Sequence, residues 1–456
     1  MKAISIAAVL VTSLALAEAP SAVAIRNARI VTVSGPVITK GTIVLRNGLI
    51  ADIGENVAVP ADAWVVEGEG LTVYPGLIDG LSTLGLGDAA PAGAAIAMPT
   101  GGGRAALAAA APANNNPPAR GPEDRPMTTS WLKAADQLKN TDRRLELARN
   151  VGFTSAVTFP KTGIFAGQGA VINLAGERAA DMVIVTSAGQ YMTMASNSFG
   201  GGFPSALFGT MAYIRQIYLD VDRYKRVKAQ YEAAPRGLPR PEYDRALEGV
   251  IDSPRILLPA SNQIQISRMI KFAAELKQKT ILYGLHDGYK TADLVKSSGL
   301  PVLVSLKWPE KARDGDPDEV ESMKTLELRD KAPGTPAALA KQGVLFGFYS
   351  DTVDAPRDWF RAVKKAMDNG LASTDALKAL TLNIAQIYGV ADRLGSIEKG
   401  KIANLVVTSG ELLQEKPPVK MIFIDGIKYE PTLEAPTPGA GGRLGGAPIT
   451  PPGKIN

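Results

Sequence analysis

The stretch that decides the fold is Thr280–Leu306, which reads TILYGLHDGYKTADLVKSSGLPVLVSL. It opens with a short apolar run at Thr280–Tyr283, which is typical of a strand. A helical pattern follows at Thr291–Ser298 and ends at Gly299. A second apolar run, Pro301–Leu306, then returns to the strand pattern. A strand, a helix and another strand in this order favour parallel strands covered by a helix.

The same alternation continues on both sides of this stretch. Helical patterns and apolar runs take turns, and the segment as a whole is Val73–Gly389. The clearest further elements are helices at Asp142–Asn150 and around Ile266–Ala273, strands at Phe153–Phe159 and Val344–Tyr349, and a helix capped by Thr335 with Pro336 in its first turn. The pattern predicts a TIM-like (β/α)8 barrel over residues 73–389, with a doubly wound sheet as the alternative.

The two outer regions, residues 20–72 and 390–430, have short alternating runs that are typical of strands. Asn47-Gly48 stands between two such runs and is a strong signal for a tight hairpin. Asp425-Gly426 is a second signal of the same kind. The sequence therefore predicts a small composite β-sandwich domain, built from both chain ends, beside the barrel.

The first 19 residues have the pattern of a signal peptide. Lys2 supplies a positive charge, Ala3–Leu16 is nearly all apolar, and small residues allow cleavage after Ala17. The apolar run is too short to be a stable membrane anchor. A periplasmic or secreted protein is therefore expected, and a buried, uncleaved N-terminal helix is the alternative.

Two further segments have compositions that bury little apolar surface. Residues 89–120 are rich in Ala, Gly, Pro and Asn, and residues 431–456 are rich in Pro and Gly. Such segments do not offset the entropy of ordering the chain. The first is expected to be a disordered insertion in the barrel, with a mobile lid as the alternative, and the second a flexible tail.

Composition excludes several kinds of site. The 456 residues contain no cysteine and one histidine, His286. Disulfides, zinc–thiolate sites, cysteine nucleophiles and sites with several histidine ligands are therefore excluded. Lys and Arg exceed Asp and Glu by only five, which disfavours a nucleic-acid partner.

Several motifs resemble one known family. They are Val73–Asp79 (VYPGLID), Gly152–Val157, Gly163–Ile172, Gly209–Gln216, Ser373–Asn383 and Leu394–Lys401. In this order they resemble the amidohydrolase superfamily, in particular its imidazolonepropionase-like, secreted subgroup. The resemblance implies a metal-dependent hydrolase barrel that acts on a carbon–nitrogen bond.

The resemblance also implies where metal ligands would stand, and most of those positions are substituted. Two histidine positions after the first strand hold Leu81 and Thr83, and a third, on the fifth strand, holds Pro259. Leucine and proline side chains offer no ligand atom, and a threonine hydroxyl is a poor ligand for zinc. We therefore predict no metal site of the usual kind.

His286 and Asp351 match the remaining functional positions of the family and are predicted to be catalytic. The alternatives are a hydrogen-bonded loop histidine and an aspartate that caps the end of a strand. No cofactor is predicted, although the carboxylates of Asp351 and Asp287 leave open a weakly held divalent cation.

Three further side chains are predicted to bind substrate. Lys161 and Gln168 follow the second barrel strand, at the end of the barrel where active sites form. Arg215 lies on a helix of the matching subgroup motif. For Arg215, a structural ion pair is the alternative.

Two functions remain open at this point. The first is an exported hydrolase that acts on a carbon–nitrogen bond, in a cyclic amide or a small peptide. The second is a metal-free pseudoenzyme, which binds a small molecule or partners an intact amidohydrolase. The chain is expected to meet a small-molecule substrate or ligand, and a homo-oligomer or a hetero-oligomer with an intact relative is left open.

Overall fold

The computed structural model describes residues 22–87, 121–196, 202–311, 320–351 and 356–431. The predicted signal peptide (1–19) and insertion (89–120) lie outside these ranges, as does the predicted tail after residue 431. In the ranges that are described, no helix combines the length and the apolar character needed to cross a membrane.

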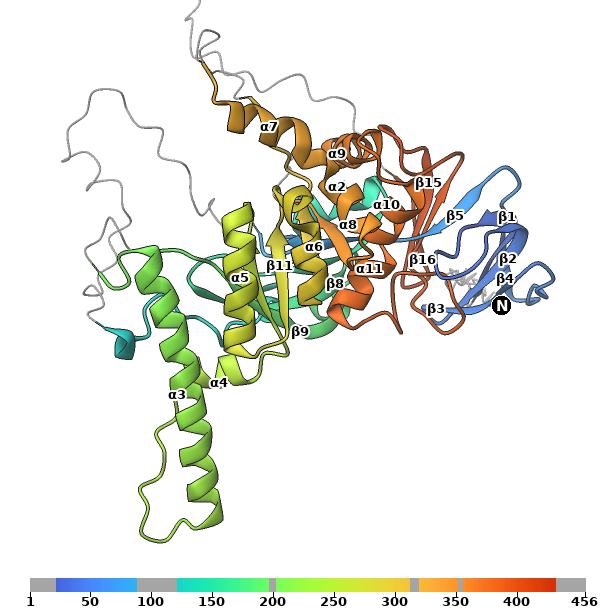
Figure 1. Cartoon of the computed structure of the whole chain (residues 1–456). Helices are drawn as coiled ribbons and strands as arrows, with labels where there is room; N and C mark the ends of the chain where they lie inside the picture. The colour runs from blue at the N-terminus through green and yellow to red at the C-terminus, as the bar shows by residue number, and fades with distance from the viewer. Residues whose placement is uncertain (1–21, 88–120, 197–201, 312–319, 352–355, 432–456) are drawn as a thin grey trace, which may run out of the picture.

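Eight strands form a nearly closed barrel, coloured from light blue to orange in Figure 1. Their order is the chain order. The strands are β6 (Leu77–Ser82), β7 (Phe153–Thr158), β8 (Phe165–Asn173), β9 (Val183–Met192), β10 (Ile256–Ala260), β11 (Thr280–Gly284), β12 (Val302–Ser305) and β13 (Phe346–Tyr349). This arrangement excludes the doubly wound alternative, because a doubly wound sheet reverses its strand order at a switch point.

The barrel departs from the predicted (β/α)8 pattern at β8. This strand runs antiparallel to both of its neighbours, β7 and β9, whereas the other strand pairs are parallel. The reason is the length of the connection. Only residues 159–164 link β7 to β8, and a crossover to a parallel strand needs a dozen or more residues.

Helices cover the outside of the barrel. They are α2 (Arg143–Asn150), α3 (Leu207–Ala233), α4 (Arg245–Ile251), α5 (Gln263–Leu276), α6 (Gly288–Ser298), α7 (Met323–Lys331), α8 (Thr335–Lys341), α9 (Pro356–Asp368), α10 (Ser373–Ala379) and α11 (Leu382–Tyr388). Single 3-10 turns stand at η1 (Pro122–Asp124), η2 (Ala134–Gln137), η3 (Ala179–Met182) and η4 (Ala332–Gly334). Local chemistry fixes several ends: the Asp142 carboxylate accepts a hydrogen bond from the backbone N–H of Arg144, and Gly299 ends α6 in the left-handed conformation.

One predicted helix cap is wrong. Thr335 is the first residue of α8, and Gly334 is its N-cap. The fully buried Thr335 hydroxyl instead donates to the carbonyl oxygen of His286 at 3.1 Å and accepts from the backbone N–H of Tyr289 at 3.1 Å. The side chain therefore fixes the loop after β11 and does not cap its own helix.

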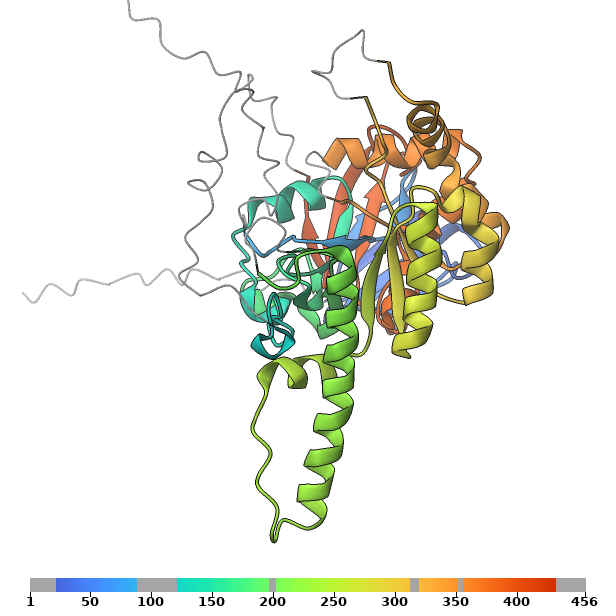
Figure 2. The same ribbon diagram turned by 60° about the vertical axis from the view of Figure 1, so that its left-hand side comes forward.

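The helix α3 extends beyond the barrel, as both views show (Figures 1 and 2). Its buried residues all lie in the N-terminal half, from Thr210 to Val221. The C-terminal half carries most of the charged residues of the segment Tyr218–Tyr231, and those side chains are exposed.

A second sheet joins the two ends of the described chain. Its order is β16 (Ile427–Tyr429), β15 (Val419–Ile424), β14 (Leu405–Thr408), β5 (Thr72–Pro75), β1 (Ala22–Ile30), β2 (Ile38–Arg46) and β3 (Leu49–Gly54), while β4 (Ala63–Glu67) pairs with β1. The turn at Asn47-Gly48 joins β2 and β3, as the sequence predicts. The pairing describes one continuous sheet, so a sandwich of two sheets stays a prediction.

The boundary between the two sheets lies at Gly76. The strand β5 belongs to the second sheet, although the sequence places Val73 at the start of the barrel. The barrel itself begins at β6. The two parts are tied by Asn404, whose side-chain amide donates to Ser155 Oγ at 2.9 Å and to Asn173 Oδ1 at 2.7 Å.

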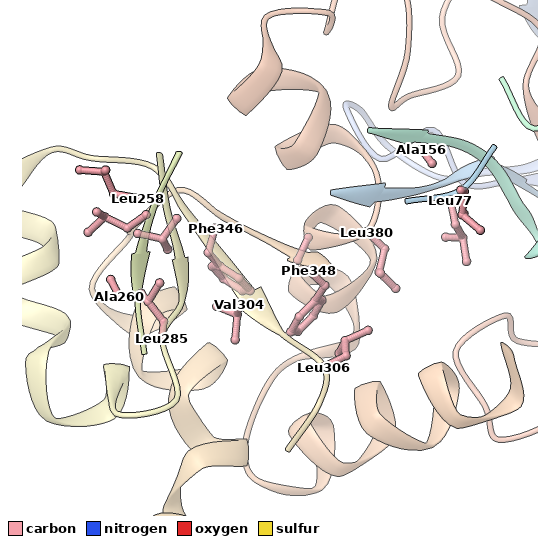
Figure 3. Packing of buried hydrophobic residues seen from close by; sticks show 14 of the residues in the cluster. Leu77, Ala156, Leu258, Ala260, Leu285, Val304, Leu306, Phe346, Phe348 and Leu380 are labelled. Atoms are coloured by element: carbon pink, nitrogen blue, oxygen red, sulfur yellow. The ribbon is translucent and has the colours of Figure 1, made fainter. Parts of the chain in front are cut away.

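The apolar core has two layers around the barrel strands. In the outer layer, strand residues such as Leu258, Val304 and Phe346 pack with the covering helices (Figure 3). The inner layer draws residues from every barrel strand, including Leu81, Leu257 and Tyr349. A cluster fed by all eight strands occupies the interior, so the barrel is a packed core and not a pore.

The helix α11 closes the end of the barrel at which β10 begins. Arg255, directly before β10, donates to the carbonyl oxygen of Ile387 at 2.6 Å, and the Tyr388 hydroxyl donates to Gly80 O at 2.6 Å. The opposite end, where the parallel strands finish, carries Lys161, His286, Lys307 and Asp351, and we call it the barrel mouth.

Candidate functional site

Asp351 lies directly after β13, at the barrel mouth. Its backbone has φ of 49°, a left-handed conformation that is uncommon for an aspartate and turns the chain away from the strand. Its Oδ2 atom accepts a hydrogen bond from Ser305 Oγ at 2.8 Å. The carboxylate is therefore held by a side chain from the neighbouring strand β12.

Ser305 also connects Asp351 to a lysine that the sequence analysis missed. The Ser305 hydroxyl accepts from the backbone N–H of Lys307 at 3.0 Å. The carbonyl oxygen of the same Lys307 lies 3.0 Å from Nε2 of His286. Because a carbonyl only accepts, Nε2 of His286 carries the hydrogen. The two predicted catalytic residues are thus joined through one segment, 305–307.

A buried carboxyl group, Asp79, stands beside this network. It comes from β6, is 1% exposed, and its Oδ1 accepts from the backbone N–H groups of Leu81 at 3.3 Å and Ser350 at 3.0 Å. Its Oδ2 is buried without a hydrogen-bond partner among the residues that the structure describes. Asp79 therefore bridges β6 and the end of β13, where the barrel has no strand ladder.

Burial controls the ionisation of Asp79. It raises the pKa of the carboxyl group to about 6, while hydrogen bonds from Ser350 and Leu81 and the charge of Lys161 act in the opposite direction. The group is ionised at neutral pH but takes up a proton under mildly acidic conditions. Asp79 is the last residue of the Val73–Asp79 motif that carries the family resemblance. The motif draws attention to this residue, but the sequence alone does not show that its carboxylate is buried and bridges two strands.

Lys161 lies in the short link between β7 and β8 and is half-buried. Burial lowers the pKa of its ammonium group, as does the charge of Lys307, whereas Asp351 and Asp79 raise it. These four side chains thus act on one another electrostatically. The structure brings Lys161 to the same group as Asp351, and a role for Lys161 in substrate binding stays a prediction.

Three tyrosines of the barrel strands β9, β11 and β13 lie near these residues. Tyr191 and Tyr283 stack with ring centroids 5.1 Å apart, and Tyr349 meets Tyr283 edge-on at 6.4 Å. Burial raises the pKa of Tyr191 to about 12 and that of Tyr349 far above its ordinary value, and the Asp351 charge adds to both effects. The phenols therefore stay protonated at neutral pH and serve as hydrogen-bonding groups, not as bases.

The donor set at the family's metal positions does not fit a metal ion. Leu81 is buried in the inner apolar layer, and Pro259 lies within β10. The Thr83 hydroxyl accepts from Arg144 Nη1 at 3.1 Å, so its oxygen is already engaged. No group of three or more His, Asp or Glu side chains suited to a metal occurs in the described ranges.

The carboxylate pair considered for a weak cation is also not brought together. Asp287 Oδ2 accepts from the backbone N–H of Gln263, the first residue of α5, at 3.1 Å. This contact directs the carboxylate to a helix N-terminus, which it stabilises. Asp351 is instead bonded to Ser305. The two side chains thus have separate structural partners.

Gln168 is buried in the wall of the barrel. Its amide nitrogen donates to Gly249 O at 2.9 Å, and its Oε1 accepts from Ser187 Oγ at 2.6 Å. Both ends of the side chain are satisfied by protein groups that tie β8 and β9 to α4. The structure does not bring Gln168 into the network of Asp351.

Arg215 lies on the outer surface, on α3. Its Nη2 donates to Glu275 Oε2 of α5 at 2.9 Å, and its guanidinium lies 5.2 Å from the Phe272 ring. The ion pair is exposed and links two covering helices. Arg215 therefore forms the structural ion pair that was the alternative to substrate binding, and it is not part of the barrel mouth.

Comparisons with known proteins agree with the barrel. Residues 262–428 match the sequence model of the Amidohydrolase family. The structure is similar to that of an amidohydrolase from Thermotoga maritima, with 26% identity and a TM-score of 0.71, over 90% of this chain and 100% of that one. A search of curated protein sequences gives no match.

Two other solved structures have the same fold at lower identity. One is a prolidase complexed with N-methylphosphonate-L-proline, 16% identical with a TM-score of 0.52, over 90% of this chain and 99% of that one. The other is a Xaa-Pro dipeptidase with methionine bound in its active site, 14% identical with a TM-score of 0.53, over 90% and 100%. The family match supports the amidohydrolase resemblance over residues 262–428, and the imidazolonepropionase-like subgroup stays a prediction.

Proposed function

We propose that this protein hydrolyses a carbon–nitrogen bond, in a cyclic amide or a small peptide, at the barrel mouth and without a resident metal ion. The observation that carries the proposal is the network in which Ser305 holds Asp351 and, through Lys307, connects it to His286. The match to the Amidohydrolase family and the fold shared with a prolidase and a Xaa-Pro dipeptidase support this class of reaction.

The chemistry assigns proton transfer to Asp351 and charge stabilisation to the two lysines of the mouth, while Ser305 positions Asp351. The Asp351 carboxylate takes a proton from water, and the water oxygen attacks the amide carbonyl carbon. The negative charge that develops on the carbonyl oxygen is stabilised by the ammonium groups of the mouth, Lys161 and Lys307. The carbon–nitrogen bond then breaks, and the proton on Asp351 passes to the leaving nitrogen.

We place this activity outside the cytoplasm, on the sequence pattern of residues 1–19. An exported chain without cysteine avoids disulfide chemistry altogether. Comparing the N-terminus of the protein recovered from the periplasm with that of the whole-cell precursor would test this placement.

A second candidate function has its own observation. Leu81 and Pro259 present no ligand atom, and the Thr83 hydroxyl is bonded to Arg144. A barrel in this state could retain its ligand and lose turnover, as a metal-free binding protein or as a partner of an intact amidohydrolase. Ligand binding is common to both candidates, and turnover separates them.

The decisive experiment compares Asp351→Asn with the wild-type protein. Purified protein, kept in a chelator, is incubated with dipeptides and small cyclic amides, and amine release is measured. We expect turnover that is insensitive to the chelator and falls by about 10²–10⁴-fold in Asp351→Asn, because the base is lost. Asp293→Asn removes an exposed carboxylate of α6 and is the matched control.

Three results would contradict the hydrolase proposal. If the chelator abolishes turnover, hydrolysis requires a bound metal ion. Equal rates in wild-type protein and Asp351→Asn would remove Asp351 from the mechanism. Saturable binding of a panel compound with no amine release would favour the second candidate.

A further inference from the structure

We propose that the part of α3 that extends beyond the barrel, together with the turn that follows it, docks the protein on an anionic lipid surface. We call residues 223–240 the distal arm; they comprise the last three turns of α3 and most of the segment that returns to α4. Charge, shape and the placement of exposed apolar side chains support this assignment.

The net positive charge of the chain is concentrated in the distal arm. The only acidic residue among these 18 is Glu232, and the six basic residues are Arg223, Lys225, Arg226, Lys228, Arg236 and Arg240. The rest of the chain has 44 basic and 44 acidic residues, so its charges balance. Each Lys or Arg near an anionic lipid surface strengthens binding about fivefold, so a cluster of this kind is sufficient for peripheral docking.

Five of the six basic side chains are available for a partner. Lys228 Nζ donates to Glu248 Oε1 of α4 at 2.8 Å and is thereby neutralised. Arg226 Nε donates to the backbone carbonyl of Asp222 at 3.3 Å, which leaves its charge unpaired. The other basic residues of the distal arm are exposed and have no ion pair to a residue that the structure describes; they are Arg223, Lys225, Arg236 and Arg240.

The shape of the molecule separates this charge from the barrel. The helix α3 continues for 12 residues after Val221, its last buried residue, which is about 18 Å at 1.5 Å per residue. Both views show this part of α3 and the returning segment projecting past the barrel (Figures 1 and 2). The Debye length at physiological salt is about 8 Å, so charges of the barrel are screened at the end of the arm.

The base of the arm carries the acidic residues and is held in place. Arg125 forms ion pairs with Asp220 of α3 and with Asp244, the N-cap of α4. The Tyr224 hydroxyl donates to Glu248 Oε1 at 2.7 Å and also joins α3 to α4. The distal arm is therefore preorganised, and its basic end is the part that an anionic surface attracts.

The exposed apolar side chains favour a lipid layer as the partner. Leu238 is 47% exposed and lies between Arg236 and Arg240 in the sequence, and Val227 is 39% exposed and directly follows Arg226. At a lipid surface, such apolar groups enter the headgroup layer while the neighbouring cations meet the phosphates. A protein interface instead buries a contiguous apolar core, and a second copy would bring like charges together.

Docking by the distal arm does not cover the barrel mouth. The arm is joined to α4, which leads directly into β10, so it leaves the barrel at the end where β10 begins. The mouth lies at the opposite end. The inference therefore goes beyond the proposed hydrolysis and does not rest on it: turnover without lipid binding contradicts the docking only, and lipid binding without turnover contradicts the hydrolysis only.

The test measures binding of the full-length protein to vesicles by flotation. One set of vesicles is phosphatidylcholine alone, and the other is phosphatidylcholine and phosphatidylglycerol in equal amounts. The measured quantity is the ratio of the two affinities, because binding through the apolar residues 3–16 would be common to both sets. We expect at least about 100-fold tighter binding to the anionic vesicles, and a marked loss of this preference when salt is raised from about 0.1 M to about 0.5 M.

A charge variant replaces the four exposed basic residues that have no ion pair, as Arg223→Gln, Lys225→Gln, Arg236→Gln and Arg240→Gln. We expect it to lose at least about 100-fold in affinity for the anionic vesicles, because each charge contributes about fivefold. The matched control removes four exposed lysines from other elements, as Lys40→Gln, Lys341→Gln, Lys378→Gln and Lys420→Gln, and is expected to bind like the wild type. Circular dichroism and thermal unfolding establish that both variants are folded.

A second measurement locates the contact. The chain has no cysteine, so Leu238→Cys provides a single thiol for a polarity-sensitive fluorophore. We expect its emission to shift to shorter wavelength when anionic vesicles are added. The same label on Lys40→Cys, an exposed position of β2, is expected to show no shift.

Four outcomes would overturn the inference. The first is equal affinity for neutral and anionic vesicles, and the second is a loss in the control variant as large as that in the charge variant. The third is an unshifted Leu238→Cys label on vesicles that do bind the protein. The fourth is tighter binding to duplex DNA or to soluble polyglutamate than to the anionic vesicles at the same concentration of negative charge, which would assign the distal arm to a nucleic acid or an acidic protein.

Discussion

The two halves of the barrel mouth differ in what their strand ends carry. The half formed by β11, β12 and β13 carries a connected polar network, from His286 through Lys307 and Ser305 to Asp351. The strands β6 and β10, which are separated by β7–β9 in the sheet, carry Leu81, buried in the inner apolar layer, and Pro259, which offers no ligand atom, and we call these two strand ends the apolar half. Asp79 links β6 to the other side of this mouth, because its carboxylate accepts from the backbone N–H of Ser350 after β13.

The difference separates two requirements of a catalytic barrel. A metal centre needs ligands from several strands that surround the ion, and one half of this mouth no longer offers them. A carboxylate that activates water needs only a held acceptor near a positive charge, and the other half still provides one. The proposed hydrolysis depends on the half that kept its polar groups, together with Lys161 in the link after β7.

The largest effect is expected when a metal-ligating side chain is placed in the apolar half. Leu81→His inserts an imidazole into a packed, fully apolar layer. We expect a loss of about 2–4 kcal/mol in the free energy of unfolding, from the lost packing and the buried ring nitrogens. Chemical denaturation measures it.

The control for this variant is Leu81→Met, which keeps the volume and polarity of the site and is expected to cost less than about 1.5 kcal/mol. Zinc is added to both proteins. A marked zinc-dependent stabilisation of Leu81→His alone would mean that the half can still build a metal site, and our account of the donor set would then be wrong.

The second prediction concerns Asp79, the residue shared by the two halves. Its pKa is raised from 3.8 in a free carboxyl group to about 6 in the folded protein, so the folded state binds the proton more tightly than the unfolded chain. Stability is therefore lost as the pH rises from about 4 to 6. The full penalty, on the order of 3 kcal/mol, is present above pH 6.

Asp79→Asn removes this penalty because asparagine does not ionise, while its carbonyl can still accept from Leu81 and Ser350. Relative to the wild type, we expect the variant to be about 2–3 kcal/mol more favoured at pH 8 than at pH 4. Denaturation curves at the two pH values measure the difference. Asp293→Asn on the surface should show no such trend, and a difference that is independent of pH would contradict the raised pKa.

Much of the fold could be predicted from the sequence. The spacing of apolar residues predicts β11, α6 and β12 within a few residues. The signal is strong in the Thr280–Leu306 stretch, where Gly299 also marks the end of the helix. The antiparallel β8 was not predicted, since its all-buried residues look like those of a parallel strand. Only the short link from β7 shows that no crossover fits.

The site was less predictable than the fold. Asp351, His286 and Lys161 come together because each follows a barrel strand, a position that the sequence reveals. Lys307 follows β12 in the same way and could have been identified by the same rule. The sequence did not reveal the positions of Gln168 and Arg215, because their partners, Gly249 and Glu275, are distant in sequence and only the folded chain brings them into contact.

The smallest effect is expected for a substitution of Thr83, which follows β6 in the apolar half. Its hydroxyl accepts from Arg144, which also donates to Thr83 O at 3.0 Å and to Gly87 O at 2.9 Å. Thr83→Val removes one of these bonds and leaves the others, so we expect a loss of about 0.5–1 kcal/mol in stability and no change in ligand binding or turnover. Thr83→Ser keeps the hydroxyl and should match the wild type. If Thr83→Val instead abolished turnover at unchanged stability, the hydroxyl would act on the substrate, and the mouth would have functional groups in both halves.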